Sequence, residues 1–490
     1  MTFPSLDTFP SLDTSRQRFI AAIGSGVMIS VAMSLHPFWL IAWIAATPLL
    51  AASFSAPLRE TVVLAVIASL LGSISRASYY LQIGGPMLMV LVPLGRAIAL
   101  VISVSLARQA VVHWRHWLSI FVYPALTAGF DMLESSFSAQ GSSASFAYSQ
   151  MNAIPVIQIA SLAGTSGIVF VVNLVASTLA IAWHQRSEPG QFRRAYAVAG
   201  SLVFAAIAFG FVRLALARRQ YEIPIGLVVE DTPQNIQASS IDAPPWTTYK
   251  TGIDDMARRG ALVVVLPQKI ATFTPAEAEA MRQALHQLGE ADRVYLLVGV
   301  TIAAQDHEEN RAWLLSPPGA LDADYSKRHL VPGVEGVFVP GHMRIVRIVE
   351  GVLTGIAIGK DMDFPRLGRE YGRGDVRLML VPAYDFGRGV WQHSRVAVLR
   401  GVEGGYSVVR AARDGLLTIS DSYGRVLYQT RSSARPYAGL EAKVPIGSGM
   451  TVYNRIGDTF GWLALVFGIT LSVFSLRPKR VEETDEIEET

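Results

Sequence analysis

The sequence predicts an integral membrane protein made of a bundle of eight transmembrane helices and one large α/β domain outside the membrane. Seven long apolar runs fill residues 19–216, and an eighth lies near the end of the chain. Between them, residues 220–455 carry more charge and alternate short β-type segments with helical ones. Only 17% of the 490 residues are charged, against about 25% in a typical soluble protein, so a large part of the chain is apolar.

The candidate spans are each close to the ~20 apolar residues that cross the hydrocarbon core of a bilayer. They cover residues 19–35, 37–55, 60–81, 87–111, 117–137, 154–183 and 195–216, and the closing span covers residues 456–476. The first is not a cleaved signal peptide, because further spans follow it directly. Residues 1–18, which repeat Phe-Pro-Ser-Leu-Asp-Thr, are predicted to be a disordered cytoplasmic tail, and residues 477–490 an acidic one.

Basic residues in the short loops predict the orientation of the bundle. They precede the first span and follow the second, fourth, sixth and closing spans, at Arg16, Arg18, Arg59, Arg108, Arg115, Arg186, Arg193, Arg194, Arg477, Lys479 and Arg480. The alternate loops, around residues 36, 84–86 and 134–152, contain neither Lys nor Arg. Because positively charged loops stay in the cytoplasm, both chain ends are predicted there and the 220–455 domain on the opposite side.

The 220–455 domain has the sequence pattern of a layered α/β fold. Its strand candidates are short runs rich in β-branched residues, at residues 225–229, 262–266, 294–300, 352–358, 376–381, 407–411 and 416–420. Residues 275–288 read as a helix. Alternation of this kind favours a sheet covered by helices, and about 235 residues are enough for a core of its own.

Composition excludes several classes of function. The chain contains no cysteine, which removes disulfides, thiolate metal sites and cysteine nucleophiles together. Its nine histidines show no metal-ligand spacing, so no metal and no other cofactor is predicted. The net charge of +3 leaves no basic footprint for nucleic acid.

Three segments of the α/β domain contain the residues with catalytic potential. Residues 262–270 form a strand candidate that ends at Pro267 and Gln268, and residues 325–332 include Lys327 shortly before Glu335. Residues 352–365 form a strand candidate that turns at Gly359. A carboxylate, a lysine and a nucleophile on a strand-end turn are the groups needed to attack a carbonyl covalently. Here the turn holds a glycine.

This arrangement resembles the nitrilase, or carbon–nitrogen hydrolase, superfamily, and the predicted eight spans narrow the resemblance to the apolipoprotein N-acyltransferases. The resemblance extends over nearly the whole chain. It includes the ordered segments HPFW (36–39), AYSQ (147–150), QNIQ (234–237), WQH (391–393), RGVEGG (400–405), VRAA (409–412) and TVYNR (451–455).

The resemblance implies an external α-β-β-α sandwich with a Glu-Lys-Cys triad, in a bacterial-type inner membrane with the sandwich on the periplasmic side. Its implied partners are a phospholipid acyl donor and a diacylated lipoprotein, and the chain is expected to be a monomer. By position, the lysine is Lys327 and the supporting glutamate is Glu335. The base position is Gln268 and the nucleophile position is Gly359.

Two of the three triad positions are thus predicted to lack their chemistry, because glutamine does not accept a proton as a carboxylate does and glycine offers no nucleophile. The chain is expected to be inactive or severely impaired in the family reaction. Three readings stay open: a non-catalytic lipid- or lipoprotein-binding protein, a deliberately inactivated enzyme, or an amidase-like hydrolase with another nucleophile. Lys360 is a candidate for that last role, although an ion pair with Asp361 or Asp363 is the more ordinary reading.

Overall fold

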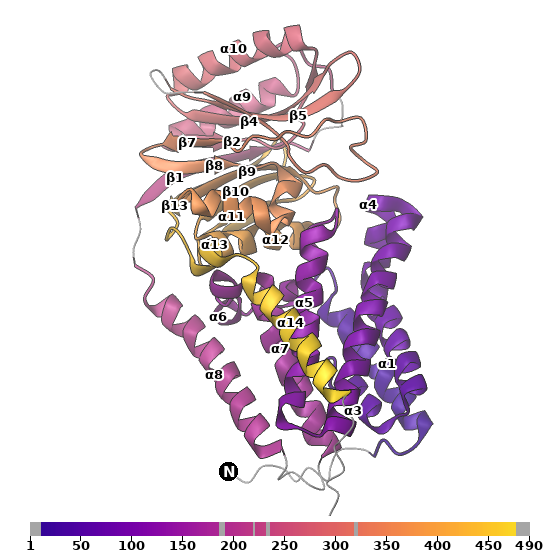
Figure 1. Cartoon of the computed structure of the whole chain (residues 1–490). Helices are drawn as coiled ribbons and strands as arrows, with labels where there is room; N and C mark the ends of the chain where they lie inside the picture. The colour runs from indigo at the N-terminus through magenta and orange to yellow at the C-terminus, as the bar shows by residue number, and fades with distance from the viewer. Residues whose placement is uncertain (1–10, 186–191, 219–220, 232–235, 318–321, 477–490) are drawn as a thin grey trace, which may run out of the picture.

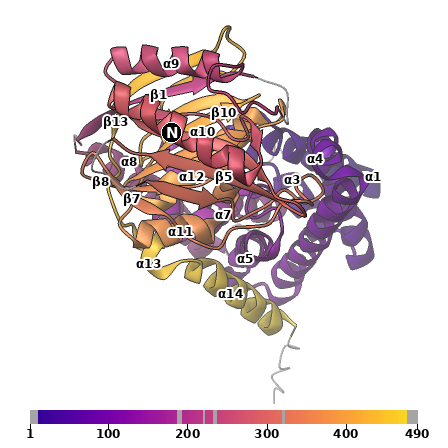
Figure 2. The ribbon, with the colours of Figure 1, turned by 90° about the horizontal axis from the view of Figure 1, so that it is seen from above.

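A computed structural model of the chain describes residues 11–185, 192–218, 221–231, 236–317 and 322–476. The molecule has two parts, a bundle of apolar helices and an α/β sandwich stacked at one end of it (Figure 1). Seen from above, the sandwich covers only part of the bundle, and α1 and α4 lie to one side of it (Figure 2).

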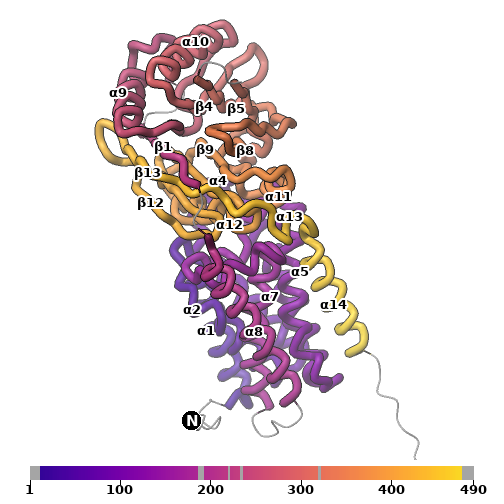
Figure 3. Tube along the Cα trace, turned by 90° about the vertical axis from the view of Figure 1, so that its left-hand side faces the viewer, coloured from indigo at the N-terminus to yellow at the C-terminus, as the bar shows by residue number. Residues whose placement is uncertain are grey.

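The bundle is built from nine described helices and three further helical turns. The helices are α1 (Ser15–Ala32), α2 (Trp39–Ala42), α3 (Thr47–Ser55), α4 (Leu58–Gln109), α5 (Val122–Phe137), α6 (Ile154–Ile157), α7 (Ala160–His184), α8 (Arg193–Ala215) and α14 (Thr459–Ser475), the last reached through α13 (Val452–Ile456) of the sandwich. A π-helical turn covers Ala110–Trp114, and 3₁₀ turns cover Trp117–Phe121 and Phe146–Gln150. Figure 3 shows α8 and α14, which connect the bundle to the sandwich, running along the bundle.

Helix α4 is a hairpin of two helices. As one straight helix its 52 residues would extend about 78 Å, far more than a bilayer is thick. The backbone leaves the helical region at Gly85, with φ of 65°, and Pro86 follows. The two ends of α4 then meet, because Arg108 Nε donates to the carbonyl of Ala56 at 2.7 Å. The predicted third and fourth spans are the two arms of this hairpin.

Three described segments are long enough and apolar enough to cross a membrane. They are Leu58–Trp114, Ala160–His184 and Arg193–Ala215, and two shorter apolar segments are Trp39–Ser55 and Thr459–Ser475. All of them lie within the predicted spans or their borders.

The boundary predicted for the N-terminal tail was wrong. Helix α1 begins at Ser15, because Thr14 and Gln17 form a capping box that satisfies the first backbone N–H groups. Arg18 is then buried and bonded to Glu60 at 2.9 Å, which ties α1 to the start of α4. Residues 1–10 and the acidic tail from residue 477 lie outside the described residues.

The sandwich consists of two sheets packed face to face. One has the strand order β13-β1-β2-β4-β5-β6 with β3 paired to β4, and the other has the order β12-β11-β10-β9-β8-β7. The strands are β1 (Glu222–Val229), β2 (Val263–Val265), β3 (Thr272–Phe273), β4 (Tyr295–Ala303), β5 (Glu308–Leu315), β6 (Ala323–Ser326), β7 (Val346–Val349), β8 (Val352–Ile356), β9 (Leu378–Tyr384), β10 (Ser407–Arg413), β11 (Leu416–Ser420), β12 (Val426–Arg431) and β13 (Ala438–Pro445). All seven predicted strands are confirmed.

Apolar side chains fill the space between the two sheets and under the helices on both outer faces. Helices α9 (Trp246–Arg258) and α10 (Pro275–Asp292) cover the first sheet, and α11 (Pro365–Arg373) and α12 (Val390–Gly404) cover the second (Figure 1). The order of layers is therefore α-β-β-α. Helix α12 lies between the second sheet and the bundle, where its residues share a buried cluster with those of α7.

The two parts are joined by polar contacts at the same turn that contains Gly359. The carbonyl of Asp363 accepts from the backbone N–H and from the hydroxyl of Ser142, both at 2.8 Å. Ser142 belongs to the loop that follows α5. A Cβ on the neighbouring Gly141 would lie 2.5 Å from the same carbonyl oxygen, so this approach requires a glycine.

Candidate active-site cavity

The four residues predicted for the active site come together at one end of the sandwich. Gln268 follows β2, Lys327 follows β6, and Gly359 follows β8 and starts a 3₁₀ turn (Gly359–Asp363). The two sheets meet here, because the backbone N–H of Gln268 donates to the carbonyl of Ala383 in β9 at 3.3 Å. Gln268, Lys327 and Gly359 line one cavity of about 40 Å³, and Glu335 contacts Lys327 behind it.

Gly359 offers space for a side chain that would face Gln268. A Cβ built at residue 359 lies 2.9 Å from Oε1 of Gln268, and its next neighbours, in Ala383, are at 3.8 and 3.9 Å. Its φ of +42° is in the left-handed region, which glycine adopts at little cost. Residue 359 therefore faces Gln268 and shares a cavity with Lys327, but it presents no nucleophilic atom to either of them.

Glu335 is held between two lysines. Lys327 Nζ lies 2.8 Å from Oε2 of Glu335, and Lys269 Nζ lies 2.6 Å from Oε1. The backbone N–H of Val331 and the amide of Asn310 donate to the same carboxylate. Burial alone would raise the pKa of Glu335, but the charges of the two lysines outweigh it and lower the pKa to about 2. Burial lowers the pKa of Lys269, against the charge of Glu335.

Sequence reasoning missed Lys269. It directly follows Gln268, and its left-handed backbone, with φ of +55°, turns the side chain toward Glu335. The only signal in the sequence was its place next to the base position.

Lys360 and Asp361 have different surroundings, although they are neighbours in the chain. Lys360 Nζ is buried 2.6 Å from Oε1 of Gln140 and 3.6 Å from Oδ2 of Asp363, and burial lowers its pKa. Asp361 is fully buried and accepts from Tyr325 OH, from the N–H groups of residues 328, 329 and 358, and from the ring of His329. The ordinary reading of Lys360 holds, because it is paired with Asp363, while Asp361 fixes the turn through its five hydrogen bonds.

A second ionic group closes the far wall of the small cavity, and sequence reasoning missed it as well. Arg410 forms a two-pronged ion pair with Asp385, with Nη1 at 2.9 Å from Oδ2. Beside it, Nε2 of His393 lies 3.1 Å from the hydroxyl of Tyr79, near the tip of the α4 hairpin. Burial lowers the pKa of His393, against the charge of Asp385, so its ring is neutral near pH 7.

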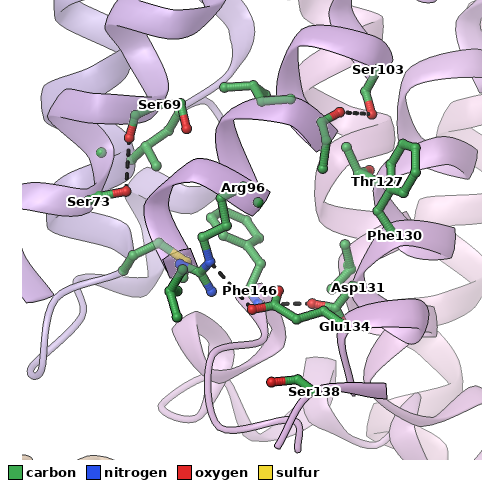
Figure 4. Close-up of a pocket in the computed structure, with 18 of the residues that line it drawn as sticks. Ser69, Ser73, Arg96, Ser103, Thr127, Phe130, Asp131, Glu134, Ser138 and Phe146 are labelled. Carbon is green, nitrogen blue, oxygen red and sulfur yellow. Dashed lines mark hydrogen bonds and ion pairs between the residues drawn. The ribbon is translucent and has the colours of Figure 1, made fainter. Parts of the chain in front are cut away.

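A much larger cavity of about 600 Å³ lies among the bundle helices. Its wall is mainly apolar, and its charged residues gather at one place, where Arg96 points toward Glu134 and Asp131 (Figure 4). Arg96 Nε lies 3.8 Å from Oε1 of Glu134, and Asp131 accepts from the hydroxyl of Ser145 at 2.9 Å. These charged residues of the bundle therefore line a cavity.

The stability of the chain in acid is expected to depend on Glu335. Its pKa is lower in the folded state than the ordinary 4.5, so its stabilisation is complete above about pH 5 and is lost as the pH falls toward 2. The shift corresponds to about 3 kcal/mol, of which about 2 kcal/mol is lost by pH 3. Between pH 6 and pH 3, the stability of Glu335→Gln against thermal unfolding should fall clearly less than that of the unaltered chain. The control Glu441→Gln, on a partly exposed strand position, should keep the slope of the unaltered chain.

The α-β-β-α layers, the buried lysine–glutamate pair at the strand ends and the apolar helices below them form the arrangement that the resemblance to carbon–nitrogen hydrolases predicts. Residues 217–433 match the family model Carbon-nitrogen hydrolase, and residues 25–178 match the model Apolipoprotein N-acyltransferase N-terminal domain. The chain belongs to the apolipoprotein N-acyltransferase family, as the sequence predicted.

Relatives of known name support this membership over the full chain. An apolipoprotein N-acyltransferase of Geobacter metallireducens is 26% identical and covers 98% of each chain. Another, of Bradyrhizobium diazoefficiens, is 23% identical over 67% of this chain and 68% of its own. Among solved structures, an amidase from Nesterenkonia sp. is similar at 18% identity and a TM-score of 0.40, over 47% of this chain and 93% of the amidase.

Proposed function

We propose that this chain is a member of the family that cannot form an acyl-enzyme and that binds lipid without transferring its acyl chain. Gly359 carries the proposal: the position that faces Gln268 and Lys327 has no side-chain atom. Covalent acyl transfer needs a nucleophile there and a base beside it. Gln268 is neutral over the whole pH range, and its amide cannot take a proton from a thiol or hydroxyl.

The proposed topology is eight spans, with both chain ends in the cytoplasm and the sandwich on the periplasmic side of an inner membrane. The proposed parts are a bundle of residues 19–216, an external domain of residues 220–455 and a closing span of residues 456–476. The meeting of Arg18 with Glu60 and of Arg108 with Ala56 supports this topology, since these basic ends gather at the bundle end away from the sandwich.

The large cavity supports a lipid-binding role. Its volume of about 600 Å³ and its mainly apolar wall are in the range of ligand pockets in proteins. It lies among the apolar helices, where a hydrocarbon chain can enter from a bilayer. The proposed ligands are therefore the family's lipid partners, a phospholipid or the acyl chains of a lipoprotein.

Filling the large cavity is expected to remove bound lipid. Ala99 lines the cavity, so Ala99→Phe should lower the lipid retained by the purified chain about fivefold or more, because the added ring takes the space of the ligand. Ile98, the next residue, is 53% exposed on the outside of the bundle, and Ile98→Phe is the matched control. Lipid is measured by extraction and mass spectrometry. Equal retention by both variants, or none by the unaltered chain, would contradict a binding role for this cavity.

A further inference from the structure

The small polar cavity and the large apolar cavity adjoin each other. Gln140 lines both of them, and the consecutive residues Val331 and Pro332 line the small and the large one respectively. The side-chain oxygen of Gln140 lies at this junction, 2.6 Å from Nζ of Lys360. A ligand could therefore occupy both spaces if its polar end replaced Gln140 on Lys360.

The small cavity carries an excess positive charge. The ion-pair groups that reach its wall are Lys360 with Asp363, Arg410 with Asp385, and Lys327 with Glu335, which also pairs with Lys269 behind the wall. Four cations face three anions, and the neutral ring of His393 does not change this balance. An unbalanced buried charge is unfavourable, so one bound monoanion would stabilise the group.

The two lysines in the wall also have hydrogen-bond donors to offer. An ammonium group has three N–H donors. Among the described residues, Lys327 Nζ bonds to Glu335 at 2.8 Å, and Lys360 Nζ bonds to Gln140 with Asp363 farther away at 3.6 Å. Both side chains are buried, at 2% and 7% exposed, so the remaining donors are turned away from bulk water.

We propose that the small cavity binds the carboxylate of a long-chain fatty acid, whose hydrocarbon chain occupies the large cavity. The inference rests on the proposed lipid-binding function and names the class of ligand. A carboxylate carries the single negative charge that the group lacks, and it accepts from both lysines. The cavity of about 40 Å³ has room for a carboxylate group.

The experiment compares two probes of equal chain length, hexadecanoic acid and its uncharged methyl ester, on the delipidated full-length protein in nanodiscs. The acid should bind about tenfold or more tightly than the ester. Lys360→Gln and Lys327→Met should each lower affinity for the acid about tenfold and leave affinity for the ester within about twofold. Lys443→Gln, at an exposed position of β13, is the matched control and should bind both probes as the unaltered chain does.

Equal affinity for acid and ester would overturn the carboxylate site while leaving the lipid-binding function in place. Binding of neither probe would overturn both. A phospholipid that displaces the acid, and whose own affinity falls in both lysine variants, would assign the anion to a phosphodiester instead and overturn the inference. Loss of ester binding in the lysine variants would show that they act through the fold, and would also count against it.

Discussion

The double substitution Gly359→Cys with Gln268→Glu is expected to produce an acyl-enzyme, whereas the unaltered chain is expected to form none. A side chain at residue 359 points at Gln268, with a Cβ 2.9 Å from its Oε1. Lys327 lines the same cavity. The two changes would therefore place a thiol beside a carboxylate base and a cation, the three groups that covalent acyl transfer requires.

The expected effect is large because the two groups act on one proton transfer. A positioned general base contributes about 10²- to 10⁴-fold, so the double variant should form the adduct at least about 100-fold faster than Gly359→Cys alone. Gln268→Glu alone should form none, since it has no nucleophile. The left-handed backbone at residue 359 costs a non-glycine residue about 1–3 kcal/mol, and packing of the surrounding residues must offset this cost.

The adduct is measured as the mass of the intact protein after incubation with phospholipid, and hydroxylamine should release it as a thioester. Both single variants serve as controls, and thermal unfolding checks that each is folded. A folded double variant without adduct would show that more than these two groups is missing.

Replacing Asp361 by Asn is expected to destabilise the sandwich by about 3 kcal/mol or more. Five donors point at the buried carboxylate, two at Oδ2 and three at Oδ1. An amide replaces one oxygen by a group that itself donates, so in either orientation at least one buried backbone N–H loses its acceptor, and the other donors lose the charge of theirs. Each such loss costs about 1–3 kcal/mol.

Two further variants separate this effect from a general sensitivity of the region. Tyr325→Phe removes one of the five donors and should cost about 1 kcal/mol. Asp375→Asn changes a half-exposed carboxylate that pairs with Arg377, and should change stability by less than about 1 kcal/mol. Denaturant unfolding in one detergent measures all three. If Asp361→Asn lowers the free energy of unfolding no more than Asp375→Asn does, Asp361 does not stabilise the turn.

Most of the fold could be predicted from short sequence patterns, because helix breaks and strand-forming runs depend on residues that are neighbours in the chain. The hairpin of α4 was visible as two apolar runs separated by Gly84, Gly85 and Pro86, where a helix cannot continue easily. The β-type runs of the sandwich alternate with helices as a layered fold requires. The start of α1 was misplaced because Thr14 and Gln17 cap it within a polar segment that resembles a disordered tail.

The candidate site was predicted in part. The residues that the sequence did not reveal come from separate elements that meet only in the fold. Gln268, Lys327, Glu335 and Gly359 were found because they stand in recognisable segments, and the structure brings them together. Asp385, Arg410 and His393 come from β9, β10 and α12 and meet only through strand pairing and packing. No spacing in the sequence marks such a meeting. The same holds for Gln140, which reaches the site from the bundle.

We propose that Gly359 and Gln268 leave the site without covalent chemistry, and the baseline of the restoration experiment is the sharpest test of this proposal. The unaltered chain is incubated with phospholipid and a diacylated lipopeptide, beside the double variant, and the N-acylated product is measured by mass spectrometry. We expect product from the double variant and none above background from the unaltered chain. Sustained turnover by the unaltered chain, abolished by Ala99→Phe but not by Ile98→Phe, would contradict it.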